Sequence, residues 1–193
     1  MERTNNNSLA FALDYATRMH KGQYRRGGDE YITHPIRVAN YVFQFKKSSN
    51  IETLLISAYL HDTIEDTEAT FYDIAQTFGP QVASIVSELT TDIDMKNEIG
   101  KTKYLSIKMK NMSSWALVVK LCDRLDNISD LETSPEEFKK RYSKETFEII
   151  EYLLNNRKLS KTHMNIIKCI MDKLSWARSS QYDNIRSLVD SKC

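Results

Sequence analysis

Glycine, proline and cysteine are scarce in this chain of 193 residues, which has five glycines, three prolines and three cysteines. A β-rich fold built on tight turns needs more glycine and proline, so their scarcity favours helices. The cysteines, Cys122, Cys169 and Cys193, lie far apart, form no CxxC pair and are odd in number. They indicate no disulfide framework, and a reducing compartment is expected.

Long apolar runs and an excess of one charge are also absent. No stretch approaches the ~20 apolar residues that span a bilayer, and the N-terminal residues lack the apolar core of a secretory signal. Lys and Arg number 27 against 26 for Asp and Glu. Because this balance gives no global field, any anion site must be a local cluster. We therefore expect a cytoplasmic protein without nucleic-acid or membrane partners, and the sequence leaves its oligomeric state open.

The composition is that of an ordinary globular protein, with 41% hydrophobic and 27% charged residues. The length suits one sizeable core and is short for two domains, and apolar residues recur at three- and four-residue steps. The sequence therefore predicts an all-α fold, a single-domain helical bundle over residues 1–193. Helices are expected at 9–21, 33–45, 51 to at least 65, 70–78, 80–89, 103–110, 114–131, 134–154, 159–174 and 184–188, with loops at 22–30 and 91–101.

Several of these helices have recognisable start signals. Thr33 and Ser134 are N-cap candidates, each followed within two residues by a proline in the expected first turn. The residues from Thr70 to Asp73 fit a capping box. Pro80 is expected to open the next helix directly after Gly79.

The residues that carry chemistry are His34, the adjacent pair His61 and Asp62, and Asp123. Imidazole and carboxylate ligands suit a divalent first-row ion, and the carboxylates favour a harder ion such as Mn²⁺. The four residues belong to three predicted helices, and helical bundles commonly build metal sites from facing side chains. A His-Asp pair alone is common on helices, so the prediction of a Mn²⁺ site depends on the combination and order of the four.

Glu65 and Asp66 follow the pair, each about one helical turn beyond His61 and Asp62 respectively. Carboxylates crowded in this way repel each other unless a cation neutralises them or one holds a proton, and such groups serve as general acids or bases. We therefore predict that Glu65 and Asp66 are catalytic. A solvated acidic helix end is the alternative.

Anion binding is predicted first for Arg25 and Arg26, in the loop before the first histidine ligand. Guanidinium groups can bind phosphate in a forked geometry and stack on a purine face, although two adjacent arginines are also common on surfaces. Lys101, Arg124 and Asn127 are further candidates for substrate contacts. The last two belong to a polar stripe, which the amphipathic pattern of the same helix does not explain.

Four segments, taken in this order, resemble the HD-type hydrolase domain of RelA/SpoT homologues, a family that includes stand-alone small alarmone hydrolases. They are MHKGQYRRGGDEYITHPIRVA (19–39), AYLHDTIEDT (58–67), FGPQVASIVSELT (78–90) and VKLCDRLDNISDL (119–131). A His-Asp pair followed by Glu-Asp-Thr, with YIxHP before it and KLxDRLxN after it, is far more specific than the pair alone. The resemblance covers about 9–155 and leaves a C-terminal helical extension at 156–193.

This resemblance implies a helical bundle that hydrolyses the 3′-pyrophosphate of ppGpp or pppGpp, releasing pyrophosphate and GDP or GTP. It also implies roles for the residues singled out above. The ligands of Mn²⁺ would be His34, His61, Asp62 and Asp123, the catalytic carboxylates Glu65 and Asp66, and the substrate contacts Arg25, stacked on the base, with Arg26 and Asn127.

The sequence departs from the family pattern at three positions. Glu30 replaces a proline, Asp126 a His or Tyr, and Ser129 an arginine. Two other functions therefore stay open: an HD phosphohydrolase acting on another nucleotide, such as NADPH or a deoxynucleotide, and an inactive HD domain that binds nucleotide and regulates a partner. The complete ligand set argues against inactivity, and the arginine loop favours the alarmone.

Overall fold

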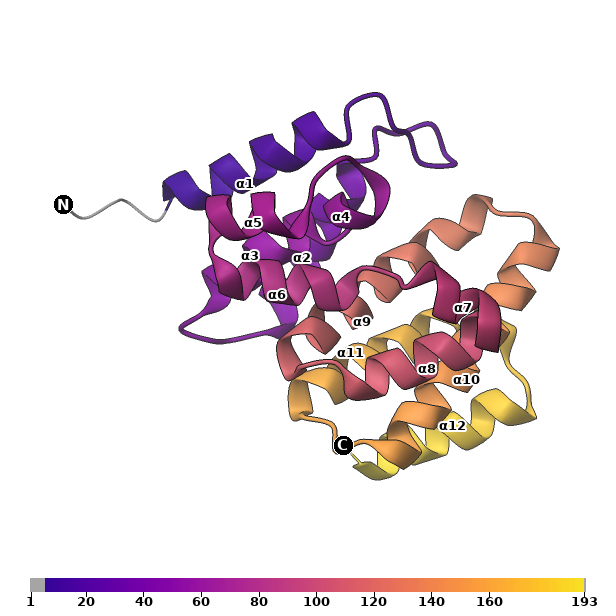
Figure 1. The fold of residues 1–193 in the computed structure, drawn as a ribbon. Coiled ribbons are helices and arrows are strands. Elements are labelled where there is room, and N and C mark those ends of the chain that lie inside the picture. The colour runs from indigo at the N-terminus through magenta and orange to yellow at the C-terminus, as the bar shows by residue number, and fades with distance from the viewer. Residues whose placement is uncertain (1–5, 193) are drawn as a thin grey trace. The chain divides into compact units, whose positions relative to one another are not determined.

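The structure is a computed structural model that describes residues 6–192, and in that range the regular elements are helices joined by loops, besides one isolated β-bridge between Tyr24 and Glu30 (Figure 1). The predicted all-α class is confirmed. No helix of the described range is long and apolar enough to cross a membrane. Residues 1–5 and Cys193, on which the expectations about a secretory signal and the cysteines partly rest, lie outside the described residues.

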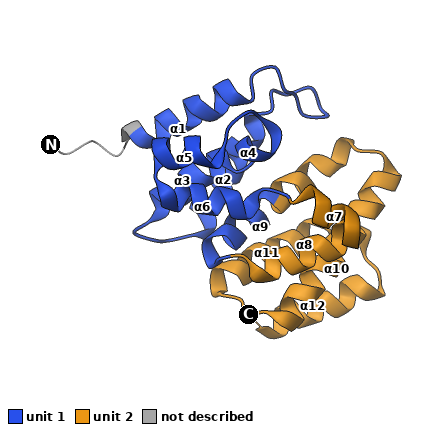
Figure 2. Ribbon diagram, viewed as in Figure 1, with its two compact units in different colours: residues 1–91, 113–123 blue, residues 92–112, 124–193 orange. Residues whose placement is uncertain are grey.

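The helices group into two compact units (Figure 2). The first contains residues 1–91 and 113–123, and the second contains residues 92–112 and 124–193. Helix α9 (Ser114–Ser129) contributes its first part to one unit and its last part to the other. The single domain over 1–193 stays a prediction.

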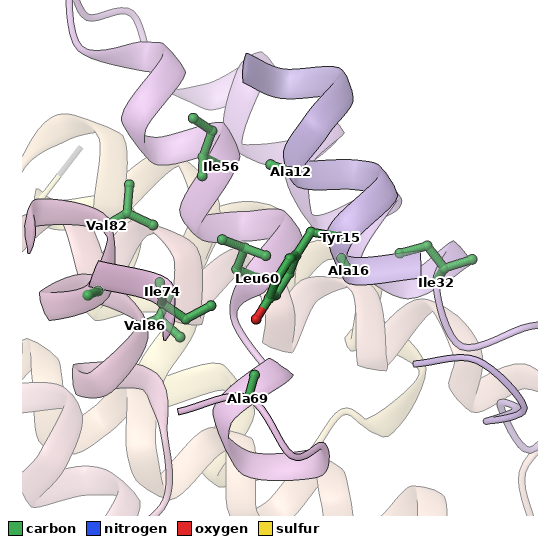
Figure 3. Close-up of a cluster of buried hydrophobic side chains, with 11 residues drawn as sticks. Ala12, Tyr15, Ala16, Ile32, Ile56, Leu60, Ala69, Ile74, Val82 and Val86 are labelled. Carbon is green, nitrogen blue, oxygen red and sulfur yellow. The ribbon is translucent and has the colours of Figure 1, made fainter. Parts of the chain in front are cut away.

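The first unit is built around α3, whose buried residues include Leu54, Ile56 and Leu60. Because α3 is apolar on most of its surface, it takes the centre and packs against α1, α2 and α6. Figure 3 shows side chains of α1, α3, α5 and α6 gathered in one cluster, among them Tyr15 and Val86. Burying one such side chain contributes about 1.5–3 kcal/mol. The helices of this unit besides α9 are α1 (Asn6–Met19), α2 (Thr33–Phe45), α3 (Ile51–Leu60), α4 (Thr63–Asp66), α5 (Phe71–Phe78) and α6 (Pro80–Leu89).

The second unit is organised around the long helix α10, which packs against α8 and α12. The guanidinium of Arg157 donates hydrogen bonds to the carbonyls of Met109 and Met112, which ties the end of α8 to the end of α10. Besides the last part of α9, the unit contains α7 (Ile93–Ile99), α8 (Lys101–Asn111), η1 (Asp130–Thr133), α10 (Glu136–Asn156), α11 (Lys161–Lys173), η2 (Ser175–Ala177) and α12 (Ser180–Lys192).

The start signals were partly correct. The capping box is confirmed, because the Thr70 hydroxyl accepts from the Asp73 N–H while the Asp73 carboxylate accepts from the Thr70 N–H. The N-cap predictions for Thr33 and Ser134 are wrong. Thr33 lies inside α2 and its hydroxyl donates to the carbonyl of Glu30, and α10 begins at Glu136 without a side-chain cap.

The predicted loop at 91–101 is also wrong, since α7 occupies most of it. Asp92 caps α7 by accepting from the N–H of Met95, and Gly100, with a φ of 84°, ends the helix. None of the α7 residues is buried. The segment therefore lacks the apolar periodicity from which a helix can be predicted.

Candidate metal centre

The predicted helix through 51–65 is interrupted at the two residues that matter most. Helix α3 ends at Leu60, and Asp62 has φ −103° and ψ −2°, so α4 starts anew at Thr63. The hydroxyl of Thr63 donates to the carbonyl of Leu60 at 2.7 Å, which fixes this break. The sequence predicted one continuous helix here, whereas His61 and Asp62 lie in a turn between two helices.

Within the first unit the predicted ligands converge. Nε2 of His34 lies 3.2 Å from Oδ1 of Asp123 and 3.7 Å from Oδ2 of Asp62. Nε2 of His61 lies 3.0 Å from the same oxygen of Asp62 and 3.9 Å from Oδ1 of Asp123. The donor atoms of His34, His61 and Asp123 all lie within 4.8 Å of one another. Residues from α2, α9 and the turn after α3 therefore face one small volume.

The hydrogen bonding of His61 indicates what that volume holds. Nδ1 of His61 lies 2.8 Å from the carbonyl oxygen of Ala58, which can only accept, so Nδ1 carries the proton. The other ring nitrogen of His61, Nε2, is buried without a hydrogen-bond partner in the described residues. Its close neighbour is a carboxylate oxygen of Asp62, 3.0 Å away. A cation bound here would be shared by the imidazole and the carboxylate, and a backbone carbonyl on the other ring nitrogen is the usual support of a metal-bound histidine.

Electrostatics favour ionised carboxylates here. Burial alone would raise the pKa of Asp62, but the imidazoles of His61 and His34 hold it below its ordinary value. Burial acts likewise on Asp123, yet the ammonium of Lys120 is the chief influence that keeps its pKa well below the usual range. Nζ of Lys120 lies 2.9 Å from Oδ2 of Asp123, leaving Oδ1 to face the histidines. The donor set and its charge indicate a divalent metal.

The two predicted catalytic carboxylates lie in α4, directly after the turn. Oε2 of Glu65 accepts from the N–H of Thr91 at 2.8 Å, which anchors it to the segment after α6. Oδ2 of Asp66 lies 3.3 Å from the hydroxyl of Tyr31. Burial, followed by the negative charges of Asp62 and Glu65, raises the pKa of Asp66. Such a carboxyl is suited to holding a proton.

The arginine loop reaches the same unit. The N–H of Arg25 donates to the carbonyl of Asp29, and Gly28, with a φ of 93°, allows the tight turn between them. The guanidinium of Arg25 lies over the Tyr31 ring, 5.8 Å from its centroid, while Arg26 is exposed. Arg25 is therefore connected to the metal centre through Tyr31.

The other predicted substrate contacts, Lys101, Arg124 and Asn127, belong to the second unit. Lys101 and Arg124 both form ion pairs with Glu145, at 3.1 Å each. Arg124 also donates to the hydroxyl of Thr146. These contacts tie α8, α9 and α10 together, and the substrate roles of the three residues stay predictions.

Three further residues support the site, and none of them was assigned a role from the sequence. Tyr31 donates to Asp62, Gln23 binds the backbone of Asp66, and Lys120 pairs with Asp123. Tyr31 was visible only as a letter of the YIxHP motif. The long sequence separations of the first two contacts left no spacing from which to infer them.

The chain belongs to the HD-domain family, since the family model described as an HD domain matches residues 12–158, about three quarters of the chain. The resemblance to HD-type hydrolases of the RelA/SpoT family is thereby confirmed at the level of the domain, and the match ends close to the predicted boundary at 155.

Individual relatives narrow the family further. A guanosine-3′,5′-bis(diphosphate) 3′-pyrophosphohydrolase of Aquifex aeolicus (strain VF5) is 37% identical over 147 residues, covering 72% of this chain and 20% of that protein. The Drosophila melanogaster enzyme of the same name, MESH1, is 36% identical over 124 residues, covering 63% of this chain and 68% of that protein. The chain thus spans about a fifth of the length of the first bacterial relatives.

A solved structure extends the comparison to the fold. It is described as a metazoan ortholog of SpoT that hydrolyzes ppGpp and plays a role in starvation responses. Its sequence is 25% identical, its TM-score is 0.68, and the match covers 90% of this chain and 98% of that one. The helical arrangement is therefore one that a protein with this described activity also uses.

Proposed function

We propose that this protein is a Mn²⁺-dependent hydrolase that removes the 3′-pyrophosphate of ppGpp and pppGpp. The observation that carries the proposal is the convergence of buried donor atoms from His34, His61 and Asp123, with Nε2 of His61 lacking a hydrogen-bond partner in the described residues and lying 3.0 Å from a carboxylate oxygen of Asp62. This arrangement fits a cation, and it lies at the His-Asp pair that defines the family. The names of the relatives supply the substrate.

His34, His61, Asp62 and Asp123 would hold the ion. Two imidazoles and two carboxylates suit a first-row divalent ion, with the carboxylates favouring Mn²⁺. A bound ion of this kind supplies Lewis-acid polarisation of a phosphoryl oxygen. Lys120 keeps the Asp123 carboxylate ionised and oriented.

Glu65 and Asp66 would manage the water and its protons. One carboxylate accepts the proton of the attacking water, whose oxygen forms a bond to the phosphorus nearest the ribose 3′-oxygen. The bond between that phosphorus and the 3′-oxygen breaks, and the 3′-oxygen takes up a proton. The products are pyrophosphate and GDP from ppGpp, or GTP from pppGpp, so atoms and charge balance without a further reactant.

Arg25 and Arg26 would bind the nucleotide. The flat guanidinium of Arg25, already lying over the ring of Tyr31, offers its other face to a purine base. Arg26 would contact phosphate, with Asn127, Lys101 and Arg124 as further expected contacts. We also propose that the protein acts in the cytoplasm, as its composition suggests, on this small nucleotide.

The experiment that tests the proposal is a comparison of substrates. The protein is incubated with ppGpp, GTP, dATP and NADPH, with Mn²⁺ or with a chelator, and the released phosphate species are identified. We expect pyrophosphate from ppGpp only in the presence of Mn²⁺. Faster cleavage of dATP or NADPH would replace the substrate and keep the hydrolase, whereas nucleotide binding without any turnover would support a regulatory HD domain.

A further inference from the structure

The hydroxyl of Tyr31 lies between two carboxylates of the site. It donates to Oδ2 of Asp62 at 2.6 Å, and the Oδ2 of Asp66 lies 3.3 Å away. A phenol has one proton, so the short contact marks the carboxylate that receives it. That same oxygen of Asp62 lies 3.0 Å from Nε2 of His61. Tyr31 therefore fixes the orientation of the proposed metal ligand Asp62 through the oxygen that also faces the imidazole of His61.

The ring of Tyr31 has a second set of neighbours. The imidazole of His20 lies against it, with the ring centroids 4.7 Å apart and an interplanar angle of 31°. The guanidinium of Arg25 lies 5.8 Å from the same ring centroid. A cation over an aromatic face is attracted by about 0.5–1 kcal/mol at an exposed site. The ring thus supports the arginine that we expect to stack on the base.

Gln23 fastens this arrangement to the backbone. Its carbonyl accepts from the N–H of Tyr31 at 3.0 Å, and its side-chain amide donates to the carbonyl of Asp66 at 2.8 Å. Its amide oxygen lies 2.8 Å from Nδ1 of His20. Gln23 therefore joins the loop before α2 to the end of α4, through its backbone on one side and its side chain on the other, and this holds Tyr31 in place relative to both.

We propose that Tyr31 is a positioning residue with two separable roles. Its hydroxyl orients the metal ligand Asp62 and steadies Asp66, and its ring supports Arg25 for nucleotide binding. Tyr31 thus contacts both the loop expected to bind the nucleotide, at Arg25, and the metal centre, at Asp62. This inference rests on the proposed function for its second role only, because the first concerns metal binding by the protein alone.

Two substitutions separate the two roles. Tyr31→Phe keeps the ring and removes the hydroxyl, and losing a partner that orients a metal ligand typically costs about 10–100-fold in metal affinity or activity. We expect the Mn²⁺ dissociation constant, measured by calorimetry without nucleotide, to rise by that factor. With saturating Mn²⁺, kcat should fall while KM for ppGpp stays near the wild-type value.

Tyr31→Leu removes the ring as well and should add a rise in KM of several-fold to the defects of Tyr31→Phe. Tyr24→Phe is the matched control. Tyr24 belongs to the same loop, is 66% exposed, and makes its bridge to Glu30 through the backbone. Neither its Mn²⁺ affinity nor its kinetic constants should change, and circular dichroism of all three variants shows whether each is folded.

Wild-type Mn²⁺ affinity in folded Tyr31→Phe would overturn the role of the hydroxyl. Equal KM values for Tyr31→Phe and Tyr31→Leu would overturn the role of the ring. The metal measurement needs no substrate. If Tyr31→Phe binds Mn²⁺ weakly and the wild type nevertheless fails to cleave ppGpp, the positioning role of the hydroxyl stands and the proposed function falls.

Discussion

Glu65 and Asp66 are adjacent, yet their surroundings differ. Both residues are exposed, but Glu65 accepts a hydrogen bond from the N–H of Thr91, whereas Asp66 faces Tyr31 and has a pKa raised by partial desolvation and then by the neighbouring carboxylates. Hydrolytic sites commonly contain two acidic groups whose surroundings give them different pKa values, so that one accepts a proton and the other supplies one. Substitutions of Glu65 and of Asp66 are therefore expected to have different effects on activity.

Glu65→Gln should lower kcat for ppGpp by ~10²–10⁴-fold, the usual contribution of a general acid–base group. The amide keeps the size of the side chain and removes its basicity, so Mn²⁺ binding and the fold should persist. Steady-state kinetics and calorimetry measure the two properties on the same sample. Glu68→Gln, at an exposed carboxylate three residues further on, is the control, and wild-type turnover in Glu65→Gln would leave Glu65 with a structural role only.

Arg25→Ala should act mainly on KM. An interaction that is equal in the ground and transition states leaves kcat nearly unchanged when it is removed. We expect the guanidinium of Arg25 to form a charge-assisted hydrogen bond to a phosphate besides stacking on the base, and such a bond contributes about 1.5–3 kcal/mol, so kcat/KM should fall by about 10- to 100-fold. Arg25→Lys keeps the charge without the flat stacking face and should recover only part of the loss. An unchanged KM in Arg25→Ala would place the base elsewhere.

Helix α5 contains none of the proposed metal ligands, so its contribution to stability can be tested separately. Replacing Thr70 by Ala removes the capping box and should lower the free energy of unfolding by about 1 kcal/mol. Urea denaturation measures this loss. Thr77→Ala, an exposed change on the same helix, should be nearly neutral. Equal stability of the two variants would mean that the cap adds nothing.

The pH dependence of this difference follows from Asp73. Hydrogen bonds from Thr70 hold the pKa of Asp73 below its ordinary value. A folded-state pKa that is lowered gives stability that is present above the unfolded-state pKa and is lost as the pH falls through the folded-state pKa. The stability gap between wild type and Thr70→Ala should therefore shrink at acid pH. A stability difference that stays constant as the pH falls below the pKa of Asp73 would contradict a role for the Asp73 carboxylate in the capping box.

Sequence periodicity predicted most helices but not their interruptions. Apolar residues continue from α3 toward Ile64, so the sequence has no signal for the end of α3 at Leu60. This break places His61 and Asp62 in a turn at the metal centre. The surface helix α7 was missed because it buries no side chain. The four predicted ligands could be singled out because their types and order are distinctive, and their side chains lie close together in the structure. Tyr31 was not, because its bond to Asp62 joins residues 31 positions apart.

Metal binding should raise the free energy of unfolding of the whole protein. A ligand that binds only the folded state adds RT ln(1 + [L]/Kd), about 2.7 kcal/mol at a concentration of 100 Kd. For a chain of this length each kcal/mol raises Tm by about 2–4 °C, so saturating Mn²⁺ should raise Tm by about 5–10 °C. His61→Ala, which removes one of the four proposed ligands, should abolish the shift. A Tm that responds to neither Mn²⁺ nor chelator would contradict a native site.

The central claim is that water attacks the phosphorus next to the ribose 3′-oxygen in a Mn²⁺-dependent reaction. Its most direct test is the hydrolysis of ppGpp in water enriched in ¹⁸O, followed by mass spectrometry of both products. We predict that each pyrophosphate carries one ¹⁸O and that GDP carries none. Label in GDP, release of labelled orthophosphate, or the absence of turnover with Mn²⁺ would contradict the account.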